Sequence, residues 1–364
     1  MKIYIIAAEK SGDQHAGALL NQLRLLSPSL EVRAVGGEAL QEAGADLFLH
    51  YQAINFMGVW EVLKNLGTIH RKIAAIKEDV AAFRPDAIIH VDASSLNMRI
   101  AAFAQTLGIQ TLYYIAPKIW AWNTGRVHKI KKLFSKIFVI FPFEKKFYAK
   151  YDVPASYAGN PTLEAVHNYL EAHPAAMQGY VALLPGSRVQ EIRKSLDVYL
   201  AVAKRMPERQ FRIAALSLLP GALYAEAKEC RNVELVFDDT YALLASAEAA
   251  CVVSGTATLE TALFGVPQVV CYRTSPLTAL VGRMVIKVPF ISLVNLVAEK
   301  EAVVELIQGD FNPARLQQEL EAVLPGGSRR SQVLADYSLL RNELGQPIAS
   351  ATAAREIAEY LGLK

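Results

Sequence analysis

Short apolar runs alternate with amphipathic segments along the whole chain. Each run has four to six residues and is rich in Val, Ile, Tyr or Phe. Such runs between helical segments are typical of buried parallel strands in βα units. The pattern predicts strands at 3–8, 32–35, 87–91, 111–115 and 137–141 in the first half, and at 180–184, 211–216, 233–236, 249–253 and 268–272 in the second.

Helical spacing of apolar residues fills the gaps between these runs. It predicts helices at 17–26 and 69–83, and a last one at 351–361 whose apolar face carries Ile357, Tyr360 and Leu361. The Gly- and Pro-containing segment 157–177 is the predicted linker, and Pro325-Gly326-Gly327-Ser328 marks a further break.

Two domains are expected, because 364 residues exceed what one core usually supports. The predicted fold is α/β, with two doubly wound, Rossmann-like domains facing a cleft. The expected boundaries are 1–158, 159–345, and a C-terminal helix in 346–364 that crosses back to the first domain. Open α/β sheets bind ligands at the carboxyl ends of their strands, so we expect a half-site in each domain.

The composition and the missing motifs argue against several classes of function. A net charge of +3 is no general nucleic-acid signature, but the segment 118–150 holds nine Lys and Arg residues and one acid, Glu144. Three cysteines without a C-x-x-C pair predict a reducing compartment, and no signal peptide or uncharged membrane-spanning stretch is expected. The scattered histidines predict no metal site, and no Walker A lysine or G-x-S-x-G elbow occurs.

Two groups in the first half are candidates for chemistry. Glu9-Lys10-Ser11-Gly12-Asp13 follows the first strand, where a helix N-terminus can bind anions; the alternative is that Ser11 or Asp13 only caps the helix. Asp92 ends the strand at 87–91 and could act as a general base, the alternative again being a helix cap. His90 is more typical of a packed core histidine.

Two groups in the second half are typical of nucleotide diphosphate binding. Gly186-Ser187-Arg188 offers open backbone and a guanidinium for phosphate, unless it is an ordinary turn. The small residues Ser254-Gly255-Thr256 leave the backbone N–H groups of a helix start accessible to a pyrophosphate, and Glu260 could accept hydrogen bonds from ribose hydroxyls. The alternative is a capping box on Thr256, although its spacing to Glu260 is one residue too long. A base in one half and diphosphate features in the other predict a nucleotide-sugar glycosyltransferase.

The ordered set of motifs resembles the lipid-A-disaccharide synthases, a family of Gram-negative glycosyltransferases, over nearly the whole chain. The motifs that carry the resemblance are Glu9–Asp13, Met57–Leu63, Asp92 with Asn97, Tyr114–Trp122, Phe141–Glu144, Leu184–Arg188, Ser254–Glu260 and Ser292–Leu296.

The resemblance implies a GT-B fold and an inverting transfer without a metal or other cofactor. The donor would be UDP-2,3-diacylglucosamine, the acceptor 2,3-diacylglucosamine 1-phosphate, and the products lipid A disaccharide 1-phosphate and UDP. Asp92 would be the general base, Arg188 would bind the diphosphate and Glu260 the ribose. Further family functional positions are Glu9, Ser11, Asn97 and Asn295, the last near the donor phosphates.

The chain also departs from the family pattern. The loop Ala93-Ser94-Ser95-Leu96 between Asp92 and Asn97 replaces the usual x-Pro-Asp-Phe, and Lys118 stands where Ser is common. Asn160 stands where many members have His, so we expect no catalytic role there.

Acyl-chain substrates reside in a membrane, so we expect a cytoplasmic enzyme held peripherally at the anionic inner-membrane surface. For the apolar residues of this surface, ordinary core packing is the alternative, and a homodimer is left open. The predicted membrane-facing residues are Ile54, Phe56, Met57, Trp60, Arg126, Lys129, Lys131 and Lys132.

Two other functions stay open at this point. A UDP-N-acetylglucosamine 2-epimerase has the same fold but needs no basic, apolar face in its first domain. A non-catalytic nucleotide-sugar-binding protein at the membrane would tolerate the loss of Asp92.

Overall fold

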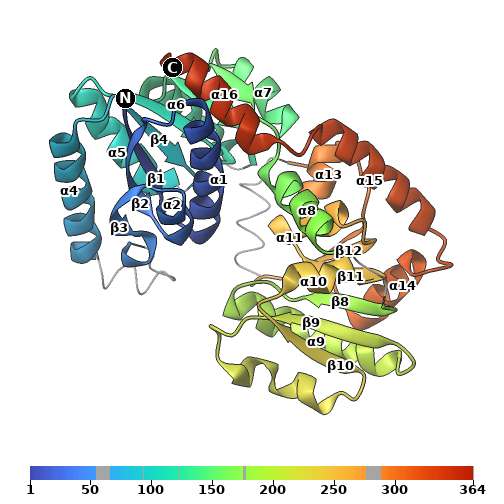
Figure 1. Cartoon of the computed structure of the whole chain (residues 1–364). Helices are drawn as coiled ribbons and strands as arrows, with labels where there is room; N and C mark the ends of the chain where they lie inside the picture. The colour runs from blue at the N-terminus through green and yellow to red at the C-terminus, as the bar shows by residue number, and fades with distance from the viewer. Residues whose placement is uncertain (55–65, 93, 122, 175–177, 276–287, 364) are drawn as a thin grey trace. The chain divides into compact units, whose positions relative to one another are not determined.

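The computed structural model describes residues 1–54, 66–92, 94–121, 123–174, 178–275 and 288–363. They form two compact units, one of Met1–Pro161 with Gln346–Lys364 and one of Thr162–Gly345. Each unit contains a parallel sheet with helices packed against it (Figure 1). The predicted fold class of two doubly wound α/β domains is confirmed.

The first unit has, among its described residues, a seven-stranded sheet in the order β3-β2-β1-β4-β5-β6-β7. All neighbouring strands are parallel. The buried runs form the central strands because both faces of a parallel sheet are covered. The strands are β1 Lys2–Ala7, β2 Glu31–Gly36, β3 Asp46–His50, β4 Ala87–Val91, β5 Gln110–Tyr114, β6 Lys136–Val139 and β7 Ala155–Tyr157.

Helices of the first unit follow these strands along the chain. They are α1 Lys10–Leu26, α2 Glu38–Glu42, α4 Leu66–Phe83, α5 Ser94–Thr106, α6 Val127–Leu133, α7 Pro142–Ala149 and α16 Ala349–Leu361, with the short 3-10 turns η1 Tyr51–Ala53, η2 Ile119–Ala121 and η3 Thr124–Arg126.

Helix α16 returns from the far end of the chain and packs against α1 (Figure 1). Its buried face was predicted only in part. Ile357 is fully buried, but Tyr360 is 41% exposed. Small residues replace the expected large ones at the contact, since Ala353 and Ala354 are fully buried.

The second unit has, in the part that is described, a six-stranded parallel sheet in the order β10-β9-β8-β11-β12-β13. The strands are β8 Tyr180–Leu184, β9 Gln210–Ala215, β10 Val233–Phe237, β11 Ala249–Val253, β12 Gln268–Tyr272 and β13 Glu305–Ile307. The helices are α9 Val189–Arg205, α10 Thr240–Ala245, α11 Thr256–Leu263, α13 Leu293–Ala298, α14 Pro313–Val323 and α15 Arg330–Leu344, with the 3-10 segment η4 Gly221–Glu229.

The predicted linker is largely helical. Helix α8, Pro161–Ala172, lies within the predicted linker segment 157–177. The unit boundary falls at the first residue of this helix, between Pro161 and Thr162. The Pro-Gly-Gly-Ser segment lies between α14 and α15, as its composition indicates.

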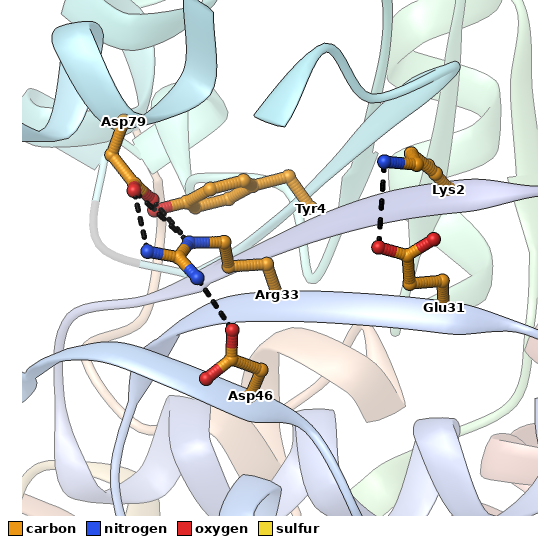
Figure 2. Close-up of polar contacts among 6 residues, drawn as sticks. All are labelled: Lys2, Tyr4, Glu31, Arg33, Asp46 and Asp79. Carbon is orange, nitrogen blue, oxygen red and sulfur yellow. Dashed lines mark hydrogen bonds and ion pairs between the residues drawn. The ribbon is translucent and has the colours of Figure 1, made fainter. Parts of the chain in front are cut away.

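An ion-pair network ties α4 to the sheet of the first unit. Figure 2 shows the Arg33 guanidinium donating to both carboxylate oxygens of Asp79, at 2.7–3.0 Å, and to Asp46 at 2.5 Å. The Tyr4 hydroxyl donates to the same Asp79 carboxylate at 2.8 Å. Since Asp79 is on α4 and its partners Tyr4 and Arg33 are on β1 and β2, the network fixes this helix on the sheet.

Candidate functional site

The strand order of the first unit reverses between β1 and β4, which places the ends of these strands side by side. Ala7 pairs with Val91, so Glu9 and Asp92 follow neighbouring strands at one edge of the sheet. A methyl group built on Gly12 would lie 3.7 Å from the Cβ atom of Asp92. Crevices for ligands occur at such reversals. The structure therefore brings the two first-half candidate groups together.

Asp13 caps a neighbouring helix instead of its own. Its carboxylate accepts hydrogen bonds from the backbone N–H groups of Gly37 at 2.6 Å and Ala39 at 2.9 Å, at the start of α2. The side chain is only 2% exposed. Asp13 is thus structural, whereas Glu9 and Ser11 are exposed beside it.

The backbone of Asp92 is held tightly. Its φ of 49° lies in the left-handed region. Its carbonyl oxygen accepts hydrogen bonds from Asn97 Nδ2 at 2.6 Å and from the Tyr113 hydroxyl at 2.7 Å. Asn97, predicted from the motif, is fully buried and contacts the backbone of Asp92 directly.

Several charges act on the Tyr113 hydroxyl. Burial raises its pKa, the hydrogen bond with Asn97 opposes this, and the charges of Asp92, Arg126 and Glu9 also act on it. Arg126 is half-buried in η3. The structure thus places this predicted membrane-facing arginine within electrostatic reach of the Asp92 site.

A buried carboxylate fixes the loop after β5. Glu144 accepts hydrogen bonds from Trp120 Nε1 at 2.8 Å and from the backbone N–H groups of Ile140 and Phe141. Burial raises the pKa of Glu144 to about 7. The Trp120 side chain, part of the Trp-Ala-Trp block, is therefore part of the core and is 7% exposed.

Apart from Arg126, the predicted membrane-facing residues divide into three groups. Lys129 and Lys132 are exposed on α6, whereas the Lys131 ammonium donates to the Tyr151 carbonyl at 2.9 Å and pairs with Asp152 at 3.6 Å. Ile54 packs on the core near β3 and α4, which differs from the predicted membrane-facing role. The third group, with Phe56, Met57 and Trp60, lies outside the described residues, as do the motif 57–63 and Trp122.

The second unit has its own strand reversal, between β8 and β11. Leu184 pairs with Val252, so the Gly186-Ser187-Arg188 and Ser254-Gly255-Thr256 motifs follow neighbouring strands. Gly186 has a φ of 99°, and a Cβ atom there would meet the Glu191 carboxylate at 2.5 Å. Only glycine fits this turn.

Glu191 organises the phosphate-binding candidate. Its Oε2 atom accepts from the backbone N–H groups of Ser187 at 3.1 Å and Arg188 at 3.2 Å. Its Oε1 atom accepts from the Arg188 guanidinium at 3.0 Å, while the Arg188 side chain stays 79% exposed. The arginine is therefore directed by an acid one helical turn away, yet remains accessible to a ligand.

The β11–α11 turn presents small residues. Gly255 is the N-cap of α11 and no side-chain cap bond forms, so the capping box on Thr256 is wrong. Gly255 and Thr256 are exposed, and the Ser254 hydroxyl donates to the Ile291 carbonyl at 2.7 Å. Glu260 accepts from the Tyr241 hydroxyl at 3.3 Å, and burial raises the pKa of its carboxyl.

The side-chain amide of Asn295 forms its hydrogen bonds within the protein. Its amide donates to the Val303 carbonyl at 2.8 Å and to Glu305 at 2.9 Å, and accepts from the Val303 N–H at 2.9 Å. It has no exposed surface. Asn295 was expected near the donor phosphates; in the structure, Asn295 and Glu305 hold the 291–292 turn that meets Ser254.

Sequence reasoning missed several residues of these sites. Tyr113 looked like an ordinary strand residue, although its place near the carboxyl end of β5 is a usable signal. Glu191 sits three residues after Arg188, the spacing at which an acid reaches back to a helix start. Tyr241 and Glu305 give no local signal.

Among the residues that the structure describes, no group of three or more His, Cys, Asp or Glu side chains could hold a metal ion. No described helix is long and apolar enough to cross a membrane.

A family model described as lipid-A-disaccharide synthetase matches residues 3–359 of the chain. The chain belongs to the lipid-A-disaccharide synthetase family. Among its relatives, the lipid-A-disaccharide synthase of Syntrophus aciditrophicus is 37% identical over 97% of this chain and 96% of its own length. The synthase of Myxococcus xanthus is 35% identical over 99% and 97%.

Solved structures with low identity show the fold of this family member. A UDP-GlcNAc 2-epimerase from Neisseria meningitidis bound to UDP-GlcNAc has a TM-score of 0.71 at 14% identity, over 99% of this chain and 100% of its own. The glycotransferase of kitacinnamycin has a TM-score of 0.64 at 15% identity, over 98% of both chains. The GT-B fold implied by the motifs is thereby confirmed.

Proposed function

We propose that this chain joins UDP-2,3-diacylglucosamine to 2,3-diacylglucosamine 1-phosphate, with inversion at the anomeric carbon, giving lipid A disaccharide 1-phosphate and UDP. Its family membership makes it a glycosyltransferase of lipid A biosynthesis. The particular acyl sugars are proposed on the strength of that membership.

The observation that carries the mechanism is the position of Asp92 at the β1/β4 reversal. Its carboxylate takes the proton from the acceptor 6-hydroxyl while that oxygen attacks the anomeric carbon of the donor. Glu9 and Ser11, exposed on the adjacent turn, bind polar groups of the same acceptor. One carboxylate is sufficient for an inverting transfer, because UDP leaves as a stable anion and does not have to be protonated by a second carboxyl group.

The donor binds the second unit at the β8/β11 reversal. The Gly186 amide, the Ser187 hydroxyl and the Arg188 guanidinium contact the diphosphate, together with the exposed start of α11 at Gly255 and Thr256. Glu260, which also accepts a hydrogen bond from Tyr241, accepts hydrogen bonds from the ribose hydroxyls. Ser254 and Asn295 shape this pocket from inside.

A membrane supplies both lipid substrates. Exposed lysines on α6 and α7, including Lys129, Lys132, Lys145 and Lys146, give the first unit a basic face for anionic headgroups. Lys131 contributes less to the binding of anionic headgroups, because its ammonium is paired with Asp152.

An epimerase function is not better supported. The epimerase from Neisseria meningitidis shares 14% identity with this chain, which shows the fold alone, whereas the two synthases share 35–37% over nearly the full length. Incubating the purified protein with both acyl-sugar precursors distinguishes the two. The proposal expects the disaccharide and an equal amount of UDP; epimerisation of UDP-N-acetylglucosamine without disaccharide formation would contradict it.

A further inference from the structure

The backbone at Asp92 has an uncommon conformation. Only a few per cent of non-glycine residues have a positive φ, and such a conformation persists where the surroundings enforce it. The following residues, 93–96, include neither proline nor glycine. The conformation of Asp92 therefore has to be held by contacts from elsewhere in the unit.

Both peptide groups beside the Asp92 Cα atom are fixed by hydrogen bonds. The Asp92 N–H donates to the Tyr114 carbonyl at 3.2 Å, which holds the peptide plane before the residue. The Asp92 carbonyl accepts from Tyr113 and Asn97, at 2.7 and 2.6 Å, which fills its two lone pairs and holds the plane after it. With both planes fixed, the direction of the Cα–Cβ bond is also fixed.

Asn97 is in turn oriented by His90. Its Nδ2 atom donates to the carbonyl oxygens of Val91 at 3.2 Å and Asp92, so its Oδ1 atom is the acceptor for His90 Nδ1 at 3.1 Å. This fixes the tautomer with the proton on Nδ1. The imidazole is fully buried against the edge of Phe134, and its Nε2 atom has no hydrogen-bond partner among the described residues.

We propose that Tyr113, and His90 through Asn97, are positioning residues that aim the Asp92 carboxylate at the acceptor. Neither side chain touches substrate in this account. The inference rests on the proposed function only in taking Asp92 as the reacting base.

Replacing Tyr113 by Phe removes one of the two donors to the Asp92 carbonyl. We expect kcat to fall about tenfold, with UDP affinity and the donor KM unchanged, because the donor binds the second unit. The matched control is Tyr180→Phe, which removes a buried phenol donating to the Leu243 carbonyl at 2.6 Å in the second unit. This control should leave kcat unchanged.

A double substitution separates positioning from general loss of structure. If Tyr113 acts through Asp92, Tyr113→Phe has no further effect on kcat once Asp92→Asn is present. An equal tenfold loss in both backgrounds, or an unchanged kcat for Tyr113→Phe alone, would overturn the inference. Wild-type activity and the Asp92→Asn single variant test the proposed function separately.

The His90 pair decides the question if Tyr113→Phe fails to fold. His90→Asn keeps an N–H donor near the place of Nδ1, whereas His90→Phe leaves the Asn97 Oδ1 atom without its partner. We expect His90→Phe to lower kcat at least fivefold more than His90→Asn, at equal UDP affinity. Equal kcat values for the two variants would overturn the inference.

Discussion

Gly12 lies against Asp92, although the two residues belong to different βα units. A methyl group on Gly12 would approach the Cβ atom of Asp92 to 3.7 Å, an ordinary contact distance. The turn after β1 and the end of β4 thus form one surface at the strand reversal. A side chain longer than a methyl group at position 12 would have to fill space beside the Asp92 Cβ atom.

Arg188→Ala should weaken donor binding without affecting stability. Its guanidinium is 79% exposed, so its loss removes little packing, but hydrogen bonds to charged groups contribute about 1.5–3 kcal/mol each. We expect UDP affinity, measured by calorimetry, to fall at least tenfold. Arg193→Ala, exposed on the same helix, is the control. Equal UDP affinities for the two variants would contradict the assigned role.

Asp79→Asn should destabilise the first unit. The Asp79 side chain is 10% exposed and accepts hydrogen bonds from both Arg33 and Tyr4. Neutralising it leaves the partly buried Arg33 guanidinium without its main charged partner. We expect about 3 kcal/mol lower unfolding free energy in urea. The exposed pair of Lys2 and Glu31, also drawn in Figure 2, is the control. Glu31→Gln should cost about 0.5 kcal/mol or less.

Glu144 should make stability depend on pH. Burial raises its pKa from 4.5 to about 7 in the folded state, so between these values the folded protein binds more protons than the unfolded chain. The contribution is fully present below about pH 4.5 and is lost as pH rises through about 7. Urea unfolding should therefore show wild type losing stability relative to Glu144→Gln from pH 5 to pH 8. A constant difference would contradict the assigned burial effect.

The basic face should bind anionic vesicles through particular lysines. Each lysine near such a surface contributes about 1 kcal/mol, so Lys129→Ala with Lys132→Ala should reduce partitioning about 30-fold at low salt. Lys131→Ala should have a smaller effect than either, because its ammonium already contacts Tyr151 and Asp152. Co-sedimentation with phosphatidylglycerol vesicles measures this. Equal losses of vesicle binding for Lys129→Ala, Lys131→Ala and Lys132→Ala, each made singly, would be inconsistent with the ion pair of Lys131.

The hydrophobic pattern predicted the central strands but missed β3, β7 and β13. These strands lie at sheet edges and are short or only half-buried, so they lack a continuous apolar run. The face of α16 was partly wrong for a related reason: close packing on α1 selects alanines, which carry little signal in a hydrophobic pattern.

The motifs correctly placed the candidate groups after the carboxyl ends of parallel strands, where the turns meet at one edge of the sheet. They gave no information on which side chains turn inward. Asn295 looks like a ligand in the sequence, yet its amide is bonded to Val303 and Glu305. Such contacts join residues that are distant in the chain or depend on side-chain direction, and no local pattern encodes them.

The role of Asp92 as general base is tested by the rate of disaccharide formation by Asp92→Asn with both acyl-sugar substrates at saturation. We expect Asp92→Asn to lower kcat by about 10²–10⁴-fold, with UDP affinity unchanged, since the amide cannot accept the proton of the 6-hydroxyl. A kcat equal to that of the wild type would contradict this role.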